Sequence, residues 1–169
     1  MAFLVVILLL PLVQPLALAL PPRSFQPPPD VWLTYHDYGN LTAELRTLNQ
    51  THPDLLRVFS IGKSVEGRDL WLCEITNRSI TTTKRALWID GGMHGDEVIG
   101  VECALHMVHF FLEKTSNDTV KRMLQEAVIY VLCMVNPDGV ERAKNATYYA
   151  DARKNAHGVD LNRNFAWYW

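Results

Sequence analysis

The chain has 169 residues, of which 49% are hydrophobic and 20% are charged, and its formal net charge is −2. This ordinary globular composition excludes a low-complexity, collagen-like or strongly charged disordered chain. The near-neutral balance offers no basic field for a nucleic acid and no polybasic patch for a membrane surface. We therefore expect no nucleic-acid partner, and no membrane association beyond what the first residues indicate.

Residues 1–20 are apolar and uncharged, and they end in Ala17-Leu18-Ala19 followed by two prolines. This small-x-small pattern is typical of signal peptidase sites and predicts a signal peptide over residues 1–19. The protein is then secreted or lies in the lumen of the secretory pathway. The alternative is an uncleaved membrane anchor, because about 20 apolar residues just span a bilayer. Prolines inside the run weigh against the anchor.

Glycosylation signals favour the same route. Five Asn-x-Ser/Thr triplets occur, whereas about one is expected by chance from this composition. We expect all five asparagines to carry glycans on surface turns. They are Asn40, Asn49, Asn77, Asn117 and Asn145.

The cysteines do not form a disulfide framework, since their number is odd. Cys73, Cys103 and Cys133 each stand in an apolar stretch, which favours buried free thiols. A bridge to residues outside this chain is the alternative.

Residues 20–33 form a Pro-rich extended lead-in, and one domain is expected over residues 34–169. Leucines at helical spacing predict a short helix over residues 40–51. Strand-like runs follow at residues 55–61 and 68–76, and the short link between them predicts an antiparallel hairpin.

A third strand is expected over residues 85–90, a helix over 97–113 and a continuously apolar, central strand over 127–135. The helix carries an apolar stripe, and most of its remaining surface is apolar too, so we expect it to be mostly buried against a sheet. Strand, helix and strand in this order form a crossover unit. The fold class is therefore α/β, with a mixed parallel and antiparallel sheet and flanking helices.

The segment Gly-Gly-Met-His-Gly-Asp-Glu, residues 91–97, lies between the third strand and the following helix, where open α/β sheets place their binding sites. His94 and Glu97 are three residues apart, which lets an imidazole and a carboxylate converge on one ion, and both donors suit Zn²⁺. For this pair alone, the alternative is a helix-capping glutamate beside an incidental histidine.

A second polar segment contains Asp-Leu-Asn-Arg-Asn, residues 160–164. In an extended backbone the side chains of Asp160, Asn162 and Asn164 share one face. Asn162 beside Arg163 offers an amide and a planar guanidinium to a carboxylate. The alternative is a polar loop held by structural hydrogen bonds.

Together the two segments resemble the zinc metallocarboxypeptidases, the family of pancreatic carboxypeptidase. The likeness covers nearly all of residues 34–165. It includes Tyr-His-Asp-Tyr from residue 35, Gly-Lys-Ser from residue 62, Asn-Pro-Asp-Gly from residue 136 and Gly-Val-Asp-Leu-Asn-Arg-Asn-Phe from residue 158. The signal peptide leads almost directly into the domain, as in the regulatory N/E branch of the family rather than the digestive branch.

The resemblance implies a role for several residues. His94 and Glu97 match two zinc ligands, and Asp160 matches the carboxylate that orients the histidine. Asn162 and Arg163 match the pair that binds the free C-terminal carboxylate of the substrate.

By the same likeness, Arg153 matches the catalytic, substrate-binding arginine that polarises the scissile carbonyl. The implied cofactor is one Zn²⁺ per domain, and the implied partner is a peptide or protein substrate with a free C-terminus. The reaction is hydrolysis of the C-terminal peptide bond, in which the metal lowers the pKa of bound water and a glutamate acts as base.

The sequence departs from the family at its end, Trp169. The family's third zinc ligand and general-base glutamate lie further downstream, so we expect a domain that is incomplete at the C-terminus and has an unpaired sheet edge. Two protein ligands are too few for a tight zinc site. We expect that this chain alone neither folds stably nor hydrolyses peptides. The other histidines are not expected to complete the site: His106 and His109 are expected on a solvated helix stripe, and His36 and His52 at the surface or in turns.

Two alternatives remain open. One is a secreted, non-catalytic carboxypeptidase-like binding protein. Such a protein would need only Asn162 and Arg163, so the presence of His94, Glu97 and Arg153 weighs against it. The other is an aspartoacylase-like amidohydrolase, which shares the His-x-x-Glu and Asp-Leu-Asn-Arg patterns but is cytosolic, in contrast to the signal peptide and sequons expected here.

Overall fold

The structure, a computed structural model, describes residues 35–145 and 152–166. The signal peptide predicted over residues 1–19 and most of the Pro-rich lead-in lie outside the described residues. Among the helices in the described part, none has the length and apolar character needed to cross a membrane.

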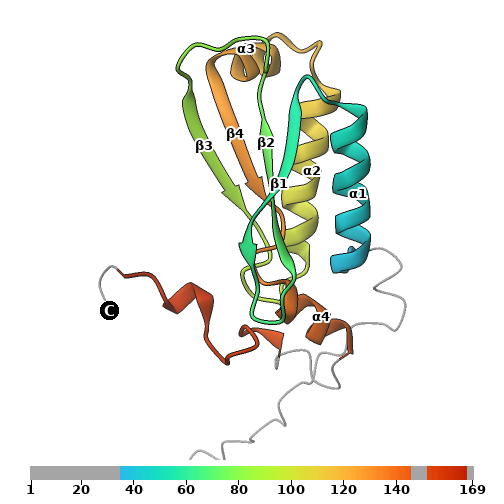
Figure 1. The fold of residues 1–169 in the computed structure, drawn as a ribbon, viewed down its shortest axis with the longest axis vertical. Coiled ribbons are helices and arrows are strands. Elements are labelled where there is room, and N and C mark those ends of the chain that lie inside the picture. Colours follow the sequence, from blue (N-terminus) through green and yellow to red (C-terminus); the bar gives the residue numbers. More distant parts are fainter. Residues whose placement is uncertain (1–34, 146–151, 167–169) are drawn as a thin grey trace, which may run out of the picture.

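The four strands form one mixed sheet in the order β1-β2-β4-β3 (Figure 1). β1 pairs with β2 and β2 with β4 in antiparallel fashion, whereas β3 and β4 are parallel. The predicted hairpin and crossover are thereby confirmed. The elements are α1 (Tyr38–Thr51), β1 (Leu56–Lys63), β2 (Asp69–Ile75), β3 (Arg85–Asp90), α2 (Ile99–Glu113), α3 (Asp118–Glu126), β4 (Ala127–Leu132), α4 (Pro137–Asn145) and a 3-10 turn at Leu161–Arg163.

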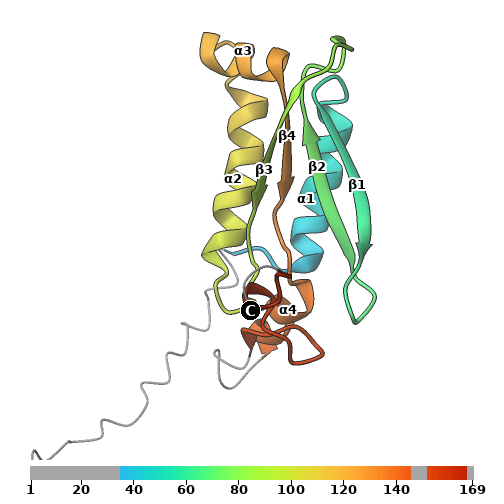
Figure 2. The ribbon, with the colours of Figure 1, turned by 90° about the vertical axis from the view of Figure 1, so that its left-hand side faces the viewer.

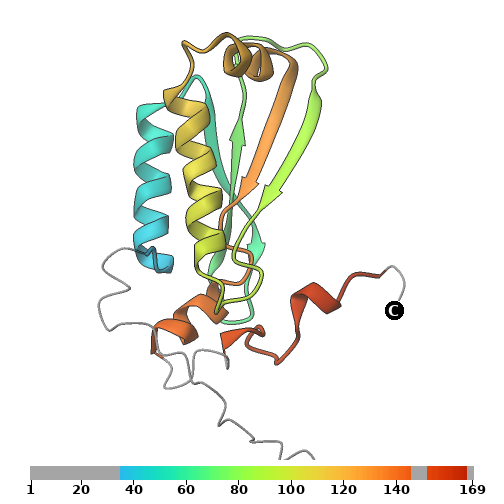
Figure 3. The same ribbon diagram turned by 180° about the vertical axis from the view of Figure 1, so that it is seen from behind.

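Helices α1 and α2 lie side by side on one face of the sheet (Figures 2 and 3). Strand residues alternate between the two faces, and those turned to the helices are fully buried. They form one core with the leucines of α1 and the apolar stripe of α2. The buried strand residues are Cys73, Ile75, Ile129 and Val131.

β3 forms an edge of the sheet within the described residues. Leu87 and Trp88 are exposed there, Trp88 to 50%. The predicted unpaired edge is therefore present in this part of the chain.

Helix α1 begins two residues before its predicted start because Asp37 caps it. The Asp37 carboxylate accepts a hydrogen bond from the backbone N–H of Asn40 at 2.7 Å, which satisfies one free donor of the first turn. The expected apolar stripe is confirmed, since Leu41, Leu45 and Leu48 are buried.

Helix α2 buries only one side. Ile99 and Phe110 are exposed on its outer surface, so the prediction of a mostly buried helix is wrong for that face. The same exposure corrects the expectation for Cys103, which is exposed, whereas Cys73 and Cys133 are buried free thiols as predicted. A hydrogen bond with the Cys73 thiol, together with burial, raises the pKa of Cys133.

The expectation that all sequons lie on turns is wrong for three of them. Asn40 and Asn49 lie within α1, inside the helix that was itself expected over residues 40–51, and Asn145 ends α4, a helix that was not predicted. Asn77 lies in a turn, and Asn117 is the exposed N-cap of α3. Glycosylation at these positions stays a prediction.

A buried carboxylate fastens the β1–β2 hairpin to the start of α4. Asp138 is 1% exposed and accepts hydrogen bonds from Ser64 Oγ at 2.7 Å, Glu66 N at 3.0 Å and Arg68 Nη1 at 2.6 Å. Burial alone would raise the pKa of Asp138, but these donors outweigh it and the pKa lies below its ordinary value.

Asp138→Asn is expected to lower the free energy of unfolding at pH 7 by about 2 kcal/mol, because an amide N–H₂ would face a donor. A lowered carboxyl pKa stabilises the fold above the unfolded-state pKa of about 3.9, and this contribution is lost as the pH falls through the folded-state value. Urea unfolding of a longer polypeptide that contains this chain, between pH 3 and 7, measures both effects. The control, Glu66→Gln, alters an exposed pair to Arg68 and should change stability by less than about 0.5 kcal/mol. Equal losses in the two variants would contradict the prediction.

Candidate metal centre

The candidate site lies at the carboxyl ends of the parallel strands β3 and β4, beside α4 (Figure 1). The segment after β3 is held there by backbone hydrogen bonds: Val135 N donates to Gly91 O at 2.9 Å, and Asn136 N donates to Gly92 O at 3.0 Å. Strand β4 ends at Leu132 and not at residue 135 as predicted, because the chain bends at Cys133.

Glycines let the segment approach its neighbours closely. A Cβ atom at Gly95 would lie 2.2 Å from the carbonyl carbon of Gly139 and 2.6 Å from Ala152 O. Gly92 has a φ of 62°, in the left-handed region that side chains disfavour. The backbone that carries His94 is thus packed directly on α4 and on the chain beside Arg153.

His94 has a different partner on each ring nitrogen. Its side chain is 5% exposed; Nδ1 lies 2.9 Å from Glu97 Oε1, and Nε2 lies 3.0 Å from Asp160 Oδ1. The Glu97 side chain contacts this imidazole, and α2 begins after Val98 without a side-chain cap. The helix-capping interpretation of Glu97 is therefore wrong.

Arg153 joins the same group. Its Nε donates to Asp160 Oδ2 at 3.1 Å, and its Nη1 donates to Glu97 Oε1 at 3.3 Å. Burial would raise the pKa of Asp160, but the hydrogen bonds from His94 and Arg153 outweigh it and lower the pKa. Glu97 is 59% exposed, so the group is open to solvent on the side of its carboxylate.

Asn162 and Arg163 lie within the 3-10 turn Leu161–Arg163, which Asp160 caps. The Asp160 carboxylate accepts a hydrogen bond from Asn162 N at 3.0 Å, and Arg163 Nη1 donates to Asn162 O at 2.9 Å. Because the backbone turns here, the extended arrangement considered for residues 160–164 is not adopted. Both side chains are exposed and share one corner of the molecule with Asp160.

Two further residues of this region were not singled out from the sequence. Asn136 is buried, and its Oδ1 accepts from Gly139 N at 3.0 Å. Asp96 has one buried carboxylate oxygen without a hydrogen-bond partner in the described part of the chain, and burial raises its pKa. The available signal was that Asn136 begins the Asn-Pro-Asp-Gly motif and that Asp96 lies within Gly-Asp-Glu.

The donors present fit part of a zinc site. Nδ1 of His94 and the carboxylate of Glu97 are suitable ligands, and Asp160 stands where a ligand-orienting carboxylate is needed. No group of three His, Cys, Asp or Glu side chains that could hold a metal occurs within residues 35–145 and 152–166. These residues therefore supply two candidate metal ligands and one candidate supporting carboxylate.

Several known proteins are similar to this chain in sequence. The sequence profile of a family described as "Zinc carboxypeptidase" matches residues 41–169. Carboxypeptidase D of Drosophila melanogaster is 37% identical over 135 residues, which cover 78% of this chain and 10% of that protein. The carboxypeptidase N catalytic chain of Rattus norvegicus is 36% identical over 143 residues, which cover 80% of this chain and 31% of that protein.

Solved structures share the fold. The carboxypeptidase A of Helicoverpa armigera superposes with a TM-score of 0.71 and 26% identity, over 80% of this chain and 34% of that one. Thrombin-activatable fibrinolysis inhibitor superposes with a TM-score of 0.73 at 24% identity, over 85% of this chain and 38% of that one. The matched curated relatives are much longer, since this chain spans 10% of one and 31% of another.

Proposed function

The chain belongs to the zinc carboxypeptidase family, and on this premise we propose that it supplies part of the active site of an enzyme that hydrolyses the C-terminal peptide bond of peptides or proteins. The observation that carries the proposal is the placing of His94 between Glu97 and Asp160. This ring is only 5% exposed and has a carboxylate on each nitrogen, and it lies at the carboxyl ends of two parallel strands, where open α/β sheets place their binding sites.

The ligands of the proposed zinc ion within this chain are His94 Nδ1 and Glu97. When bound, Zn²⁺ supplies a Lewis acid and lowers the pKa of a bound water toward about 7. Asp160 accepts the Nε2–H of His94, which fixes the tautomer and leaves the Nδ1 lone pair for the metal. The hydrogen bond of 3.0 Å between Asp160 and the ring also fixes the direction of that lone pair.

The proposed roles of the arginines follow from their positions. Arg153 contacts both Glu97 and Asp160, so its guanidinium lies where the scissile carbonyl would meet the metal ligands and can stabilise negative charge there. Arg163 and Asn162 are exposed and free to bind a carboxylate. Because a guanidinium binds a carboxylate bidentately, this pair would select a free C-terminus over an internal peptide bond.

The remaining parts of the site are proposed to lie outside the described residues. A catalytic zinc site has three protein ligands and an open position, and this chain spans only 31% of its rat relative. We call the polypeptide that holds this chain together with a third ligand and a general-base glutamate the complete peptidase. The signal-like residues 1–19 and five sequons support its secretion, and we expect the isolated chain to hydrolyse no peptide.

The test uses Arg163→Ala in the complete peptidase. We expect kcat/KM for peptides with a free C-terminus to fall by roughly 100-fold or more, because the bidentate contact is lost. Hydrolysis of matched free-acid and C-terminally amidated peptides measures both the rate and the selectivity. A non-catalytic binding protein would bind the free-acid peptide without cleaving it.

The matched control is Lys154→Ala, which removes an exposed cation from the same loop. It should leave kcat/KM within about two-fold, as expected for a screened surface charge. An Arg163→Ala enzyme with unchanged rate and selectivity would remove Arg163 from the proposed role.

A further inference from the structure

Asn136 lies at the junction of three segments that carry the proposed site. It directly precedes α4 and is 2% exposed. Its backbone N–H donates to Gly92 O at 3.0 Å, in the segment that leads to His94. Its side chain reaches in another direction, to the chain that carries Arg153.

The two ends of the Asn136 amide have different partners. Oδ1 accepts a hydrogen bond from Gly139 N at 3.0 Å and so caps the first turn of α4. Nδ2 donates to Arg153 O at 3.5 Å. Because a buried donor without an acceptor is costly, the amide is stabilised in the orientation that faces Arg153 O.

Close packing keeps this long contact in place. A Cβ atom at Gly139 would lie 2.4 Å from Asn136 Nδ2 and 2.7 Å from Ala152 O, so the absence of a side chain at this glycine leaves room for both groups. Ala152 itself is fully buried. The Asn136 amide thus packs between the start of α4 and the backbone of residues 152–153. A displacement of the amide would be transmitted to that backbone, because close-packed interiors transmit strain.

The backbone of Arg153 sets the origin of a side chain that meets two carboxylates. Nε of this arginine lies 3.1 Å from Asp160 Oδ2, and Nη1 lies 3.3 Å from Glu97 Oε1. The side chain is 36% exposed, so it is packed on one side only. A buried contact at the Arg153 backbone therefore contributes to holding the guanidinium at the candidate metal centre.

We propose that Asn136 is a positioning residue for Arg153: its amide holds the Arg153 carbonyl so that the guanidinium is placed to stabilise charge on the scissile carbonyl. This inference rests on the proposed function, because it assigns a part in the same reaction. Asn136 acts through Arg153 and not by contact with the substrate. A displacement of about 1 Å lowers the rate of a reaction between positioned groups by up to roughly 100-fold, so a loss of placement is measurable in kcat.

The test uses Asn136→Ser in the complete peptidase. Serine is as good a helix cap as asparagine, so α4 keeps its acceptor, but the serine side chain is too short to reach Arg153 O. We expect kcat for free-acid peptides to fall by roughly 10- to 100-fold and KM to change by less than about three-fold, because the lost stabilisation is specific to the transition state. Zinc content, measured by mass spectrometry, should be unchanged.

A double-mutant cycle separates positioning from a general effect on the fold. In an Arg153→Ala background, Asn136→Ser should change kcat by less than about two-fold, since the group that Asn136 positions is absent. An equal loss in both backgrounds, an unchanged kcat in the single variant, or loss of zinc from it would each overturn the inference. An Arg153→Ala enzyme with unaltered kcat would contradict the proposed role of Arg153 itself, and the inference with it.

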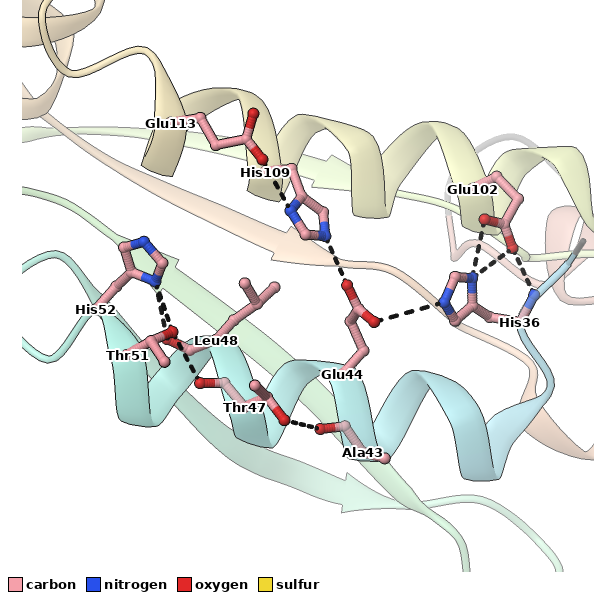
Figure 4. A network of polar contacts seen from close by, with 10 residues as sticks. All are labelled: His36, Ala43, Glu44, Thr47, Leu48, Thr51, His52, Glu102, His109 and Glu113. Carbon is pink, nitrogen blue, oxygen red and sulfur yellow. Dashed lines mark hydrogen bonds and ion pairs between the residues drawn. The ribbon is translucent and has the colours of Figure 1, made fainter.

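A separate polar network between α1 and α2 provides the control (Figure 4). Glu44 of α1 lies 2.8 Å from His109 Nε2 and 3.9 Å from His36 Nε2. The same network corrects two expectations from the sequence, which placed His36 at the surface or in a turn and His109 on a solvated stripe. Because α1 packs alongside α2, their side chains are 27% and 30% exposed and face glutamates of the neighbouring helix. Both expectations are therefore wrong.

The control variant is Glu44→Gln, which alters a hydrogen-bonding side chain in that network and leaves the contact between Asn136 and Arg153 in place. Its kcat should stay within about two-fold of the unaltered enzyme. A loss as large as that of Asn136→Ser would show that kcat responds to any disturbance of the fold, which would overturn the inference.

Should Asn136→Ser fail to fold, Asn136→Asp takes its place in the same cycle. An ionised aspartate also caps α4 but offers Arg153 O no donor, so the expected losses are the same. Failure of both variants to fold would show that the fold as such requires Asn136, and this outcome would also overturn the inference.

Discussion

Replacing His94 by alanine is expected to remove zinc from the complete peptidase and to lower kcat/KM by roughly three orders of magnitude or more. The reason is geometric: Nδ1 of this ring stands 2.9 Å from the Glu97 carboxylate, with Asp160 holding the opposite nitrogen at 3.0 Å. Without the ring, Glu97 would be the sole proposed ligand among the described residues. Metal content by mass spectrometry and peptide hydrolysis give the two readouts.

The matched control is His157→Ala, which removes an exposed histidine from the loop beside Arg153. Its metal content and rate should stay within about two-fold of the unaltered enzyme, as for most surface replacements. Retention of one zinc per protein in the His94→Ala variant would contradict the ligand assignment, even if activity were lost.

Replacing Gly95 by alanine is expected to destabilise the fold by about 3 kcal/mol or more. The new Cβ would stand 2.2 Å from the carbonyl carbon of Gly139 and 2.6 Å from Ala152 O, and backbone atoms cannot move aside as a flexible side chain can. The midpoint of urea unfolding should fall, and zinc affinity should fall with it, because His94 is carried by the displaced segment.

Gly39→Ala provides the control for this substitution. Its Cβ would lie 3.4 Å from the Asp37 carboxylate, an ordinary contact within helix α1, so stability should change by less than about 1 kcal/mol. Equal stability of the Gly95→Ala variant and the unaltered protein would show that the close approach to α4 is not required.

Much of the sheet could be predicted because its signals are local. The hairpin link and the apolar strands around it report on neighbours in the sequence, and both were found. Helices α3 and α4 were missed because they are only nine residues each, shorter than the window of about 11 to 18 residues over which a helical period is recognised. The outer face of α2 was expected to be buried because its composition is apolar, yet Ile99 and Phe110 are exposed within the described residues.

In the candidate site, too, contacts between sequence neighbours could be predicted, whereas contacts between distant positions could not. His94 and Glu97 share one turn of chain, so their spacing alone predicted that they converge. The contact of Arg153 with Glu97 joins positions 56 apart, and no local pattern reports such a pairing. The family likeness supplied the roles of Arg153 and Asp160, and the contacts with His94 and Glu97 supply the physical reason for placing them together.

One carboxylate, Asp160, serves three parts of the site at once. It accepts from the ring of His94, from the guanidinium of Arg153 and from the backbone of Asn162. A shift of the imidazole on taking up the proposed ion would move this carboxylate, and with it the turn that presents Arg163. Thermodynamic linkage makes such an influence mutual, so occupancy by the metal and affinity for the substrate's terminus would each report on the other.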